Sequence, residues 1–138
     1  MPQGSLIKDL KVKSENEYVL VPDGFTLGAK VFTDRSYELI EVPAELEGAT
    51  YIKVPIVDRI TTGNDHLTFS LYRAALVFVG YDSESTPPGW LAAWEKTDLT
   101  ATNSGAHKFD FYKKAFRLGE QVSLGGGWAH PLHVFNCN

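Results

Sequence analysis

The feature that most constrains this chain is its division into short apolar segments, with turn residues roughly every 8 to 12 positions. Within the segments, β-branched and aromatic residues alternate with polar ones, as expected for strands with one buried face. The clearest case is residues 66–72, where the residues expected to point inward are Leu67, Phe69 and Leu71. No long amphipathic helix interrupts the pattern. The sequence therefore predicts an all-β fold of roughly nine or ten strands, an antiparallel β-sandwich of jelly-roll type.

Proline and glycine place the turns in the first half of the chain. Residues 8–22 predict two strands around a polar turn, and Pro22-Asp23-Gly24 predicts a reversal of the chain. A strand is expected over residues 25–32, with one face formed by Leu27, Ala29 and Val31. Another is expected over residues 37–42. Residues 43–48 begin with proline and end with glycine, which suits a single helical turn.

The second half predicts further strands. Residues 50–60 are β-branched, although Pro55 favours an edge strand or a bulge there. A small, polar connection is expected over residues 100–106. It is followed by strand candidates whose ranges are 108–117, 121–124 and 132–137.

An aromatic loop follows the apolar strand candidate at residues 75–79. Gly80, Tyr81 and Asp82 lead into a Pro-Pro-Gly loop that carries Trp90 and Trp94. These tryptophans either close one end of the core or form a platform for a ligand. Because they are four residues apart, one helical turn would put both rings on one side. This spacing favours a core position for at least one of them.

Length and charge limit the organisation of the protein and its partners. A chain of 138 residues fits one domain. We expect residues 1–5 to be a possible expression remnant and residues 6–138 to form that single β-sandwich domain. The net charge of -4 offers no broad basic field, so neither nucleic acid nor membrane is an expected partner. A single cysteine, Cys137, excludes an internal disulfide.

Catalytic patterns are weak in this sequence. The histidines have no nucleophile signature near them; they are His66, His107, His130 and His133. Carboxylate pairs for glycoside hydrolysis cannot be placed from a sequence of this type. No catalytic residue is therefore assigned, and enzymatic activity is not expected.

Metal sites are also weakly indicated. His130 and His133 could share zinc only if a bend joined them, since a strand puts residues three apart on opposite faces and Pro131 opposes a helix. Oxygen-rich positions could bind Ca²⁺, although Asp and Asn more often cap turns; they are residues 64–65, residues 82–84, Asp98 and Asn103. No cofactor and no metal ligand is assigned, with Ca²⁺ as the open possibility.

Several spaced blocks of the chain resemble β-sandwich accessory modules of secreted polysaccharide-degrading enzymes, lyases and glycosidases among them. The blocks read G-F-T-L-G-A-K-V-F-T-D-R-S-Y (24–37), V-P-A-E-L-E-G-A-T-Y-I-K (42–53), A-L-V-F-V-G-Y-D (75–82), P-G-W-L-A-A-W (88–94), F-D-F-Y-K-K-A-F (109–116) and V-S-L-G-G (122–126). The resemblance covers most of the chain from Gly24 onward. The end of the chain, G-G-W-A-H-P-L-H-V-F-N, departs from it.

The resemblance implies an extracellular or periplasmic, non-catalytic module that binds a polysaccharide or oligosaccharide, with a catalytic domain of the same parent protein as a further partner. Sugar rings pack their C–H faces on aromatic side chains while polar groups bond the hydroxyls. The predicted ligand-binding residues are Asp34, Arg35, Tyr37, Tyr81, Asp82, Trp90, Trp94 and Trp128. Trp128 has no support from the resemblance. The alternative is a structural or protein-interaction domain without a sugar ligand, in which the same aromatic residues form the core.

Overall fold

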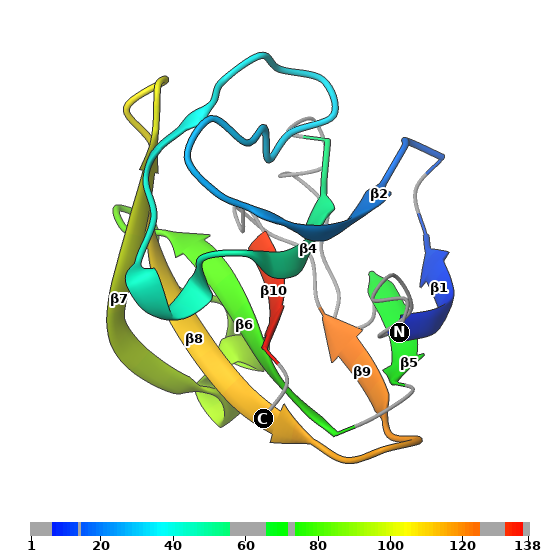
Figure 1. The fold of residues 1–138 in the computed structure, drawn as a ribbon. Helices are drawn as coiled ribbons and strands as arrows, with labels where there is room; N and C mark the ends of the chain where they lie inside the picture. The colour runs from blue at the N-terminus through cyan, green and yellow to red at the C-terminus, as the bar shows by residue number, and fades with distance from the viewer. Residues whose placement is uncertain (1–6, 14, 56–65, 72–73, 125–131, 137–138) are drawn as a thin grey trace.

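The computed structural model describes residues 7–13, 15–55, 66–71, 74–124 and 132–136, which form two antiparallel sheets (Figure 1). The strands are β1 (Ile7–Val12), β2 (Val19–Phe25), β3 (Leu39–Glu41), β4 (Ala49–Lys53), β5 (Leu67–Leu71), β6 (Ala75–Asp82), β7 (Glu95–Asn103), β8 (Lys108–Phe116), β9 (Gln121–Leu124) and β10 (Leu132–Asn136). Two short 3-10 helices accompany them, η1 (Ala44–Leu46) and η3 (Gly89–Ala93). The all-β antiparallel sandwich is confirmed, and the jelly-roll type stays a prediction.

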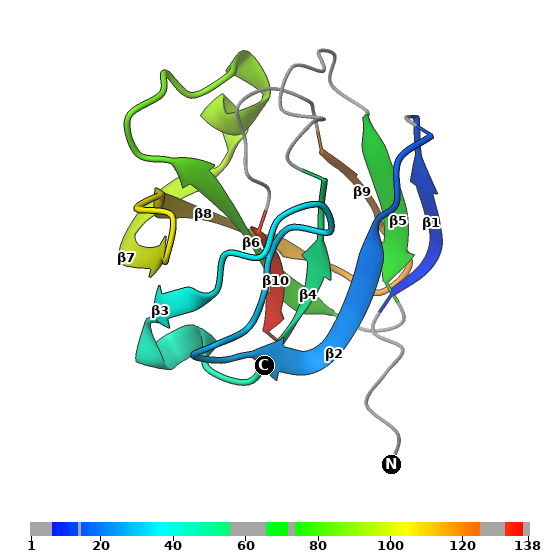
Figure 2. The same cartoon turned by 90° about the horizontal axis from the view of Figure 1, so that it is seen from above.

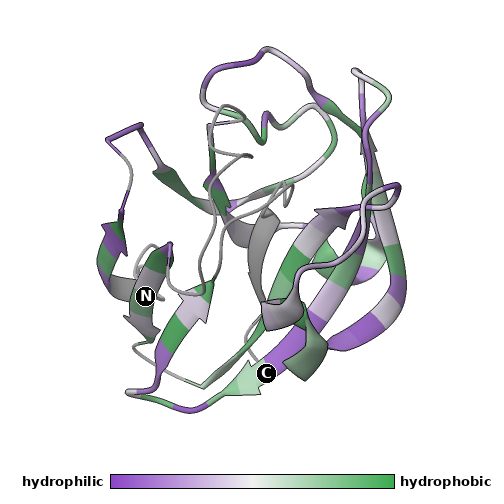
Figure 3. Ribbon diagram, turned by 180° about the vertical axis from the view of Figure 1, so that it is seen from behind, coloured by the Kyte–Doolittle hydropathy of each residue, from purple (hydrophilic) through white to green (hydrophobic). Residues whose placement is uncertain are grey.

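The smaller sheet has the strand order β1-β5-β9 and a single buried face. In β5, Leu67, Phe69 and Leu71 are buried, while the two residues between them are half-buried, as the alternation of the sequence predicts. β9 alternates in the same way, and the hydropathy of the strands in Figure 3 follows this pattern. At the edge strand β1, the pairing with β5 shifts between Lys8 and Lys11, and Asp9 has φ of 56°.

The larger sheet has the order β2-β4-β10-β6-β8-β7-β3 and is covered on both faces at its centre. Consecutive residues of β6 are buried, with Val77 and Val79 at 0% exposure and Phe78 at 4%. The sheet curls, and the chain that follows β2 reaches the opposite edge strand, β3 (Figure 2). There the Gly28 amide donates to the Leu39 carbonyl at 2.8 Å. The two edges of the sheet are thus joined by one segment.

The curled sheet encloses an aromatic core. The ring of Phe25 lies edge-on to Tyr51 at 5.6 Å and to Phe111 at 6.2 Å. Phe25 and Phe111 are at 0% exposure and Tyr51 is at 1%. These ring contacts pack β2 against β4 and β8, which are far apart in the sequence.

Two predictions for the first half of the chain are wrong. Pro22-Asp23-Gly24 does not reverse the chain, because β2 continues through it to Phe25. The turn residues instead produce a register shift between Val21 and Phe25, with Asp23 at φ 53°. Residues 25–32 do not form the predicted strand: after Phe25, the last residue of β2, they contain only isolated bridges, and Leu27 is 63% exposed.

The remaining predictions can be compared element by element. The helical turn within residues 43–48 is confirmed as η1, and β9 has the predicted bounds. The connection predicted at residues 100–106 is wrong in its first part, since β7 extends to Asn103. Neither 3-10 helix, nor any other helical part of the described residues, is long and apolar enough to cross a membrane.

Candidate functional site

The segment from Lys30 to Ser36 builds one wall of an open groove. Its backbone runs beside the end of β4: the Val54 amide donates to the Val31 carbonyl at 3.0 Å, and the Thr33 amide donates to the Val54 carbonyl at 2.9 Å. Val31 and Phe32 are buried at 1% and 2% exposure and anchor the segment. The polar residues that follow Phe32 are therefore held at the surface.

We call this groove the cationic groove, defined by Glu17, Lys30, Thr33, Asp34, Arg35 and Lys53 together with the apolar Val19 and Phe32. Its volume is about 380 Å³, which is within the range of small-molecule sites. Three cationic side chains share it with two carboxylates. Arg35 donates to the Asp34 carbonyl at 2.7 Å and lies 3.6 Å from its carboxylate. Within the described part of the chain, Lys30 and Lys53 form no ion pair.

Tyr51 fixes the backbone beneath Lys30. Its hydroxyl donates to the Lys30 carbonyl at 2.7 Å, and burial raises the pKa of Tyr51 to about 12. The hydroxyl thus stays a donor over the whole physiological pH range. Lys30 is also joined to Glu38 by an isolated bridge, so its backbone is held from two sides.

Tyr37 belongs to an aromatic cluster beside the groove. Its half-buried ring is 6.4 Å from Phe32 and 5.2 Å from His107, both in edge-on geometry. The ring lies so close to Gly105 that a Cβ there would meet it at 2.8 Å. Asn103 shapes this turn, since its side-chain oxygen accepts from the Gly105 amide at 2.9 Å and the His107 amide at 3.1 Å.

A second region, which we call the tryptophan corner, consists of Trp90, Trp94 and Phe116. The chain turns through η3, where Pro88 precedes the first residue and the Trp94 amide donates to the Leu91 carbonyl at 3.0 Å. The Trp94 ring is 6.4 Å from Trp90 and 5.8 Å from Phe116. Trp94 is 9% exposed and Trp90 is half-buried against the core. The rings do lie side by side, and Trp94 packs as a core residue.

The cationic groove and the tryptophan corner lie at opposite ends of the larger sheet. His133 of β10 pairs with Ile52 of β4 on one side and with Val79 of β6 on the other. Lys53, which follows Ile52, therefore lies near the end of β6. Phe116 instead pairs with Ala75, the first residue of β6. The eight residues of β6 span roughly 23 Å at about 3.3 Å per residue. The predicted ligand-binding residues are therefore divided between two places.

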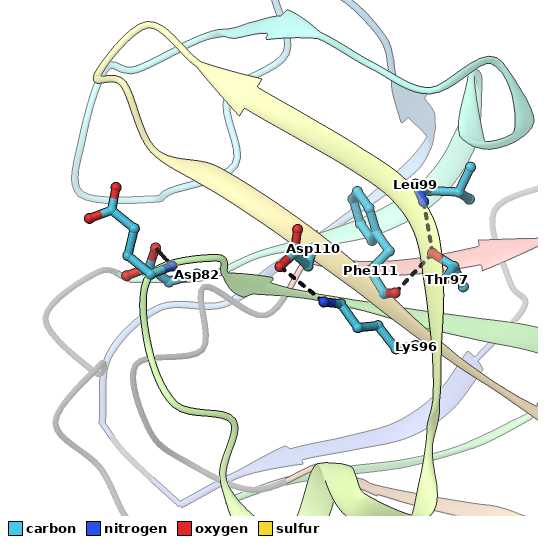
Figure 4. Close-up of polar contacts among 7 residues, drawn as sticks. Asp82, Lys96, Thr97, Leu99, Asp110 and Phe111 are labelled. Carbon is cyan, nitrogen blue, oxygen red and sulfur yellow. Dashed lines mark hydrogen bonds and ion pairs between the residues drawn. The ribbon is translucent and has the colours of Figure 1, made fainter.

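Tyr81 and Asp82 end β6 at the groove's end of the sheet, but both are engaged in the fold. Tyr81 is 4% exposed, which argues against stacking on a sugar in this conformation. The Asp82 carboxylate accepts from the Glu84 amide at 3.2 Å (Figure 4). It also accepts from the Ser85 hydroxyl at 2.8 Å, so it caps the turn. The pairing of β7 with β8 is interrupted by a register shift between Lys96 and Thr100. There the Thr97 hydroxyl donates to the Phe111 carbonyl at 2.9 Å (Figure 4).

Other predicted positions are placed as follows. Trp128 and His130 lie outside the described residues, as do residues 64–65. His133 contributes backbone pairing in β10. Among the residues that the structure describes, no three His, Cys, Asp or Glu side chains are grouped so as to hold a metal ion.

Sequence reasoning missed Lys30, Lys53 and Glu17, which meet Asp34 and Arg35 in the groove. Residues 31–33 reach β4 through a parallel bridge between Phe32 and Val54, a non-local pairing without a sequence signal.

A further hollow of about 480 Å³ has an apolar floor of Leu76, Phe78 and Leu99 and a charged rim that includes Glu45, Glu95 and Lys113. It contains none of the predicted ligand-binding residues.

The fold recurs inside larger enzymes. The chain matches part of a β-glucuronidase from glycoside hydrolase family 2 with a TM-score of 0.84 and 19% identity, covering 99% of this chain and 15% of that one. It matches a GH138 enzyme targeting pectin rhamnogalacturonan II with a TM-score of 0.66 and 16% identity, covering 100% of this chain and 17% of that one. No family model and no curated protein matches the sequence. At these identities the similarity establishes the fold.

Proposed function

We propose that this protein is a non-catalytic carbohydrate-binding accessory module that is part of, or acts with, polysaccharide-degrading enzymes. The observation that carries the proposal is the match of 99% of the chain to a 15% portion of a glycoside hydrolase. A domain of this fold is thus one component of a much larger glycosidase. The blocks of sequence that resemble accessory modules support the same assignment.

The cationic groove is the place where a sugar would bind. It offers carboxylate acceptors and amino and guanidinium donors over a small apolar floor, which suits hydroxyl groups on a shallow ligand. Asp34 and Arg35 keep the role predicted for them, and Tyr37 supports the adjacent loop. A shallow surface with few contacts gives modest affinity, so binding in the micromolar to millimolar range is expected.

The proposal includes the setting of the module. Its partners are a polysaccharide or oligosaccharide and a catalytic domain, either in the same parent protein or beside it. Its place is outside the cytoplasm, in the extracellular space or the periplasm, where polymeric sugars are degraded. Nucleic acid and membranes are not among the proposed partners.

Binding can be tested by affinity electrophoresis and calorimetry on a panel of neutral and acidic plant and algal polysaccharides. We expect retardation by at least one polymer and a measurable dissociation constant for its oligosaccharides. The fluorescence of Trp90 and Trp94 is a poor reporter here, because both lie at the far end of the sheet. A folded protein that binds no polymer of the panel would contradict the proposal.

The second candidate is a structural or protein-interaction domain without a sugar ligand. It is favoured by the burial of Trp94 and Tyr81 and by the apolar floor of the hollow at Leu76, Phe78 and Leu99. Charges around an apolar centre are the usual composition of a docking surface. Failure of all polysaccharides in the panel, together with binding to a glycosidase catalytic domain, would favour this function.

A further inference from the structure

We propose that the cationic groove selects acidic sugar units, with Lys30 and Lys53 binding the carboxylate or sulfate group and Arg35 completing the positive wall. This inference rests on the proposed function and adds the chemical class of the ligand. Neutral sugars require only hydrogen-bond donors and acceptors. Lys30 and Lys53 line the groove without an ion pair to any described residue, which favours a ligand that brings its own negative charge.

The charge distribution supports an anionic ligand. The whole chain has a net charge of -4, yet the groove contains three cations and two carboxylates. Asp34 lies next to Arg35, whereas Lys30 and Lys53 pair with no carboxylate among the described residues. The groove is therefore locally positive on an acidic protein. Charge-assisted hydrogen bonds from lysine to a carboxylate or sulfate are roughly twice as strong as neutral ones.

The frame of the groove is formed before a ligand arrives. Lys53 ends β4 and pairs with Val19 of β2, while the backbone of Lys30 is held by the Tyr51 hydroxyl at 2.7 Å. The Arg35 guanidinium is oriented by the Asp34 carbonyl. Cationic side chains on fixed backbone lose less freedom on binding than side chains on a mobile loop.

Stacking on the described aromatic residues contributes little to this selectivity. Phe32 is only 2% exposed, and Trp94 is at the opposite end of β6. The ligand is thus recognised through charge at its acidic group. Such binding depends on ionic strength, because exposed charges are screened over a Debye length of about 30 Å at roughly 0.01 M salt but only about 3 Å at 1 M.

The decisive ligands are a matched pair: oligogalacturonides with free carboxylates and the same oligomers fully methyl-esterified. Their rings and hydroxyls are alike, and only the negative charge differs. We expect the esterified form to bind at least tenfold more weakly. A sulfated galactan, compared with a neutral galactan, tests whether sulfate is recognised as well as carboxylate. High salt should weaken the binding of the acidic ligands only.

The matched variants are Lys30→Gln and Lys53→Gln, which keep a polar side chain but remove its charge. Each is expected to weaken binding of the preferred acidic oligomer about tenfold, as loss of one charge-assisted contact does. Lys11→Gln, at an exposed position of β1, is the control and should bind like the unchanged protein. Unfolding curves of all three verify that the fold is retained.

The outcomes separate the inference from the proposed function. Equal affinity for acidic and neutral sugars overturns the inference and leaves a carbohydrate-binding module. A preference for acidic sugars that Lys30→Gln and Lys53→Gln leave unchanged overturns the assignment to this groove. Binding to no polysaccharide contradicts both. A loss of acidic binding in the two groove variants, with Lys11→Gln unaffected, supports the inference.

Discussion

The tryptophan corner and the cationic groove use the same sheet in opposite ways. At the corner, Trp94 packs on Phe116 at 5.8 Å and is 9% exposed, so its apolar surface contributes to folding. At the groove, Lys30 is exposed and Lys53 half-buried, and neither forms an ion pair with a described residue. Trp94, which has a strong sequence signal, thus belongs to the core, while Lys30 and Lys53 line the groove where we propose that a ligand binds.

The largest expected effect is at the corner. Trp94→Ala should lower the free energy of unfolding by about 3–5 kcal/mol, because it removes a large ring from a packed site. Urea denaturation measures the loss, and a smaller loss is expected for Trp90→Ala, whose ring is half-buried. If Trp94→Ala instead kept its stability and lost affinity for sugar, the corner would be the binding site.

A middle-sized effect is expected beside the groove. Gly105→Ala would place a Cβ 2.8 Å from the Tyr37 ring, so the ring must shift and its contact with His107 must change. The expected loss of stability is about 1–3 kcal/mol. NMR shifts of His107 should change with it, since they report the neighbouring ring.

The matched control for this substitution is Gly89→Ala in η3, where a Cβ meets nothing within 4 Å. Its stability should change by less than about 0.5 kcal/mol. Equal effects of the two substitutions would show that Tyr37 is not held by Gly105.

Tyr51→Phe removes the hydrogen bond to the Lys30 carbonyl. At neutral pH this should lower the free energy of unfolding by about 1 kcal/mol. The pKa of Tyr51 is about 12 in the fold against 10.0 ordinarily. Its contribution to stability is complete below pH 10 and is lost as the pH rises through 12, since only the unfolded chain ionises in between. Between neutral pH and pH 11, the free energy of unfolding of the unchanged protein should therefore fall by about 1 kcal/mol more than that of the variant.

An effect on stability as small as that of Tyr51→Phe is expected at Asp82. Asp82→Ala removes its bonds to the Ser85 hydroxyl and the Glu84 amide and should cost about 1 kcal/mol in thermal unfolding. Affinity for the acidic oligomer should not change. A tenfold loss of affinity would return Asp82 to the binding site and extend the groove toward the end of β6.

Local periodicity was sufficient to predict strands whose buried face does not depend on which strand they pair with. The alternation of Leu67, Phe69 and Leu71 fixes their buried face whatever strand lies beside them. The interpretation of Pro22-Asp23-Gly24 was wrong because the same residues suit a reversal or a bulge, and pairing with β4 decides between them. The connection predicted over residues 100–106 was wrong as far as Asn103, because small polar residues suit a loop or a strand and pairing with β8 decides between them.

The site was predicted only in part for the same reason. Asp34 and Arg35 stand out in a polar turn and do line the groove. Lys30 and Lys53 are 23 positions apart and become neighbours through the pairing of residues 31–33 with β4. The spacing of Trp90 and Trp94 did indicate that their rings lie together, but burial depends on Phe116, a contact that no local pattern contains.

The irregular edge of the smaller sheet also affects how copies of the protein meet. Among the described strands, β1 pairs only with β5, so its outer side is an edge that another chain could pair with. The register shift between Lys8 and Lys11 and the φ of 56° at Asp9 interrupt the straight row of backbone groups that such pairing needs. Exposed Lys11 and Lys13 add repulsion between like edges. These irregularities oppose edge-to-edge aggregation of β1 between copies of the protein.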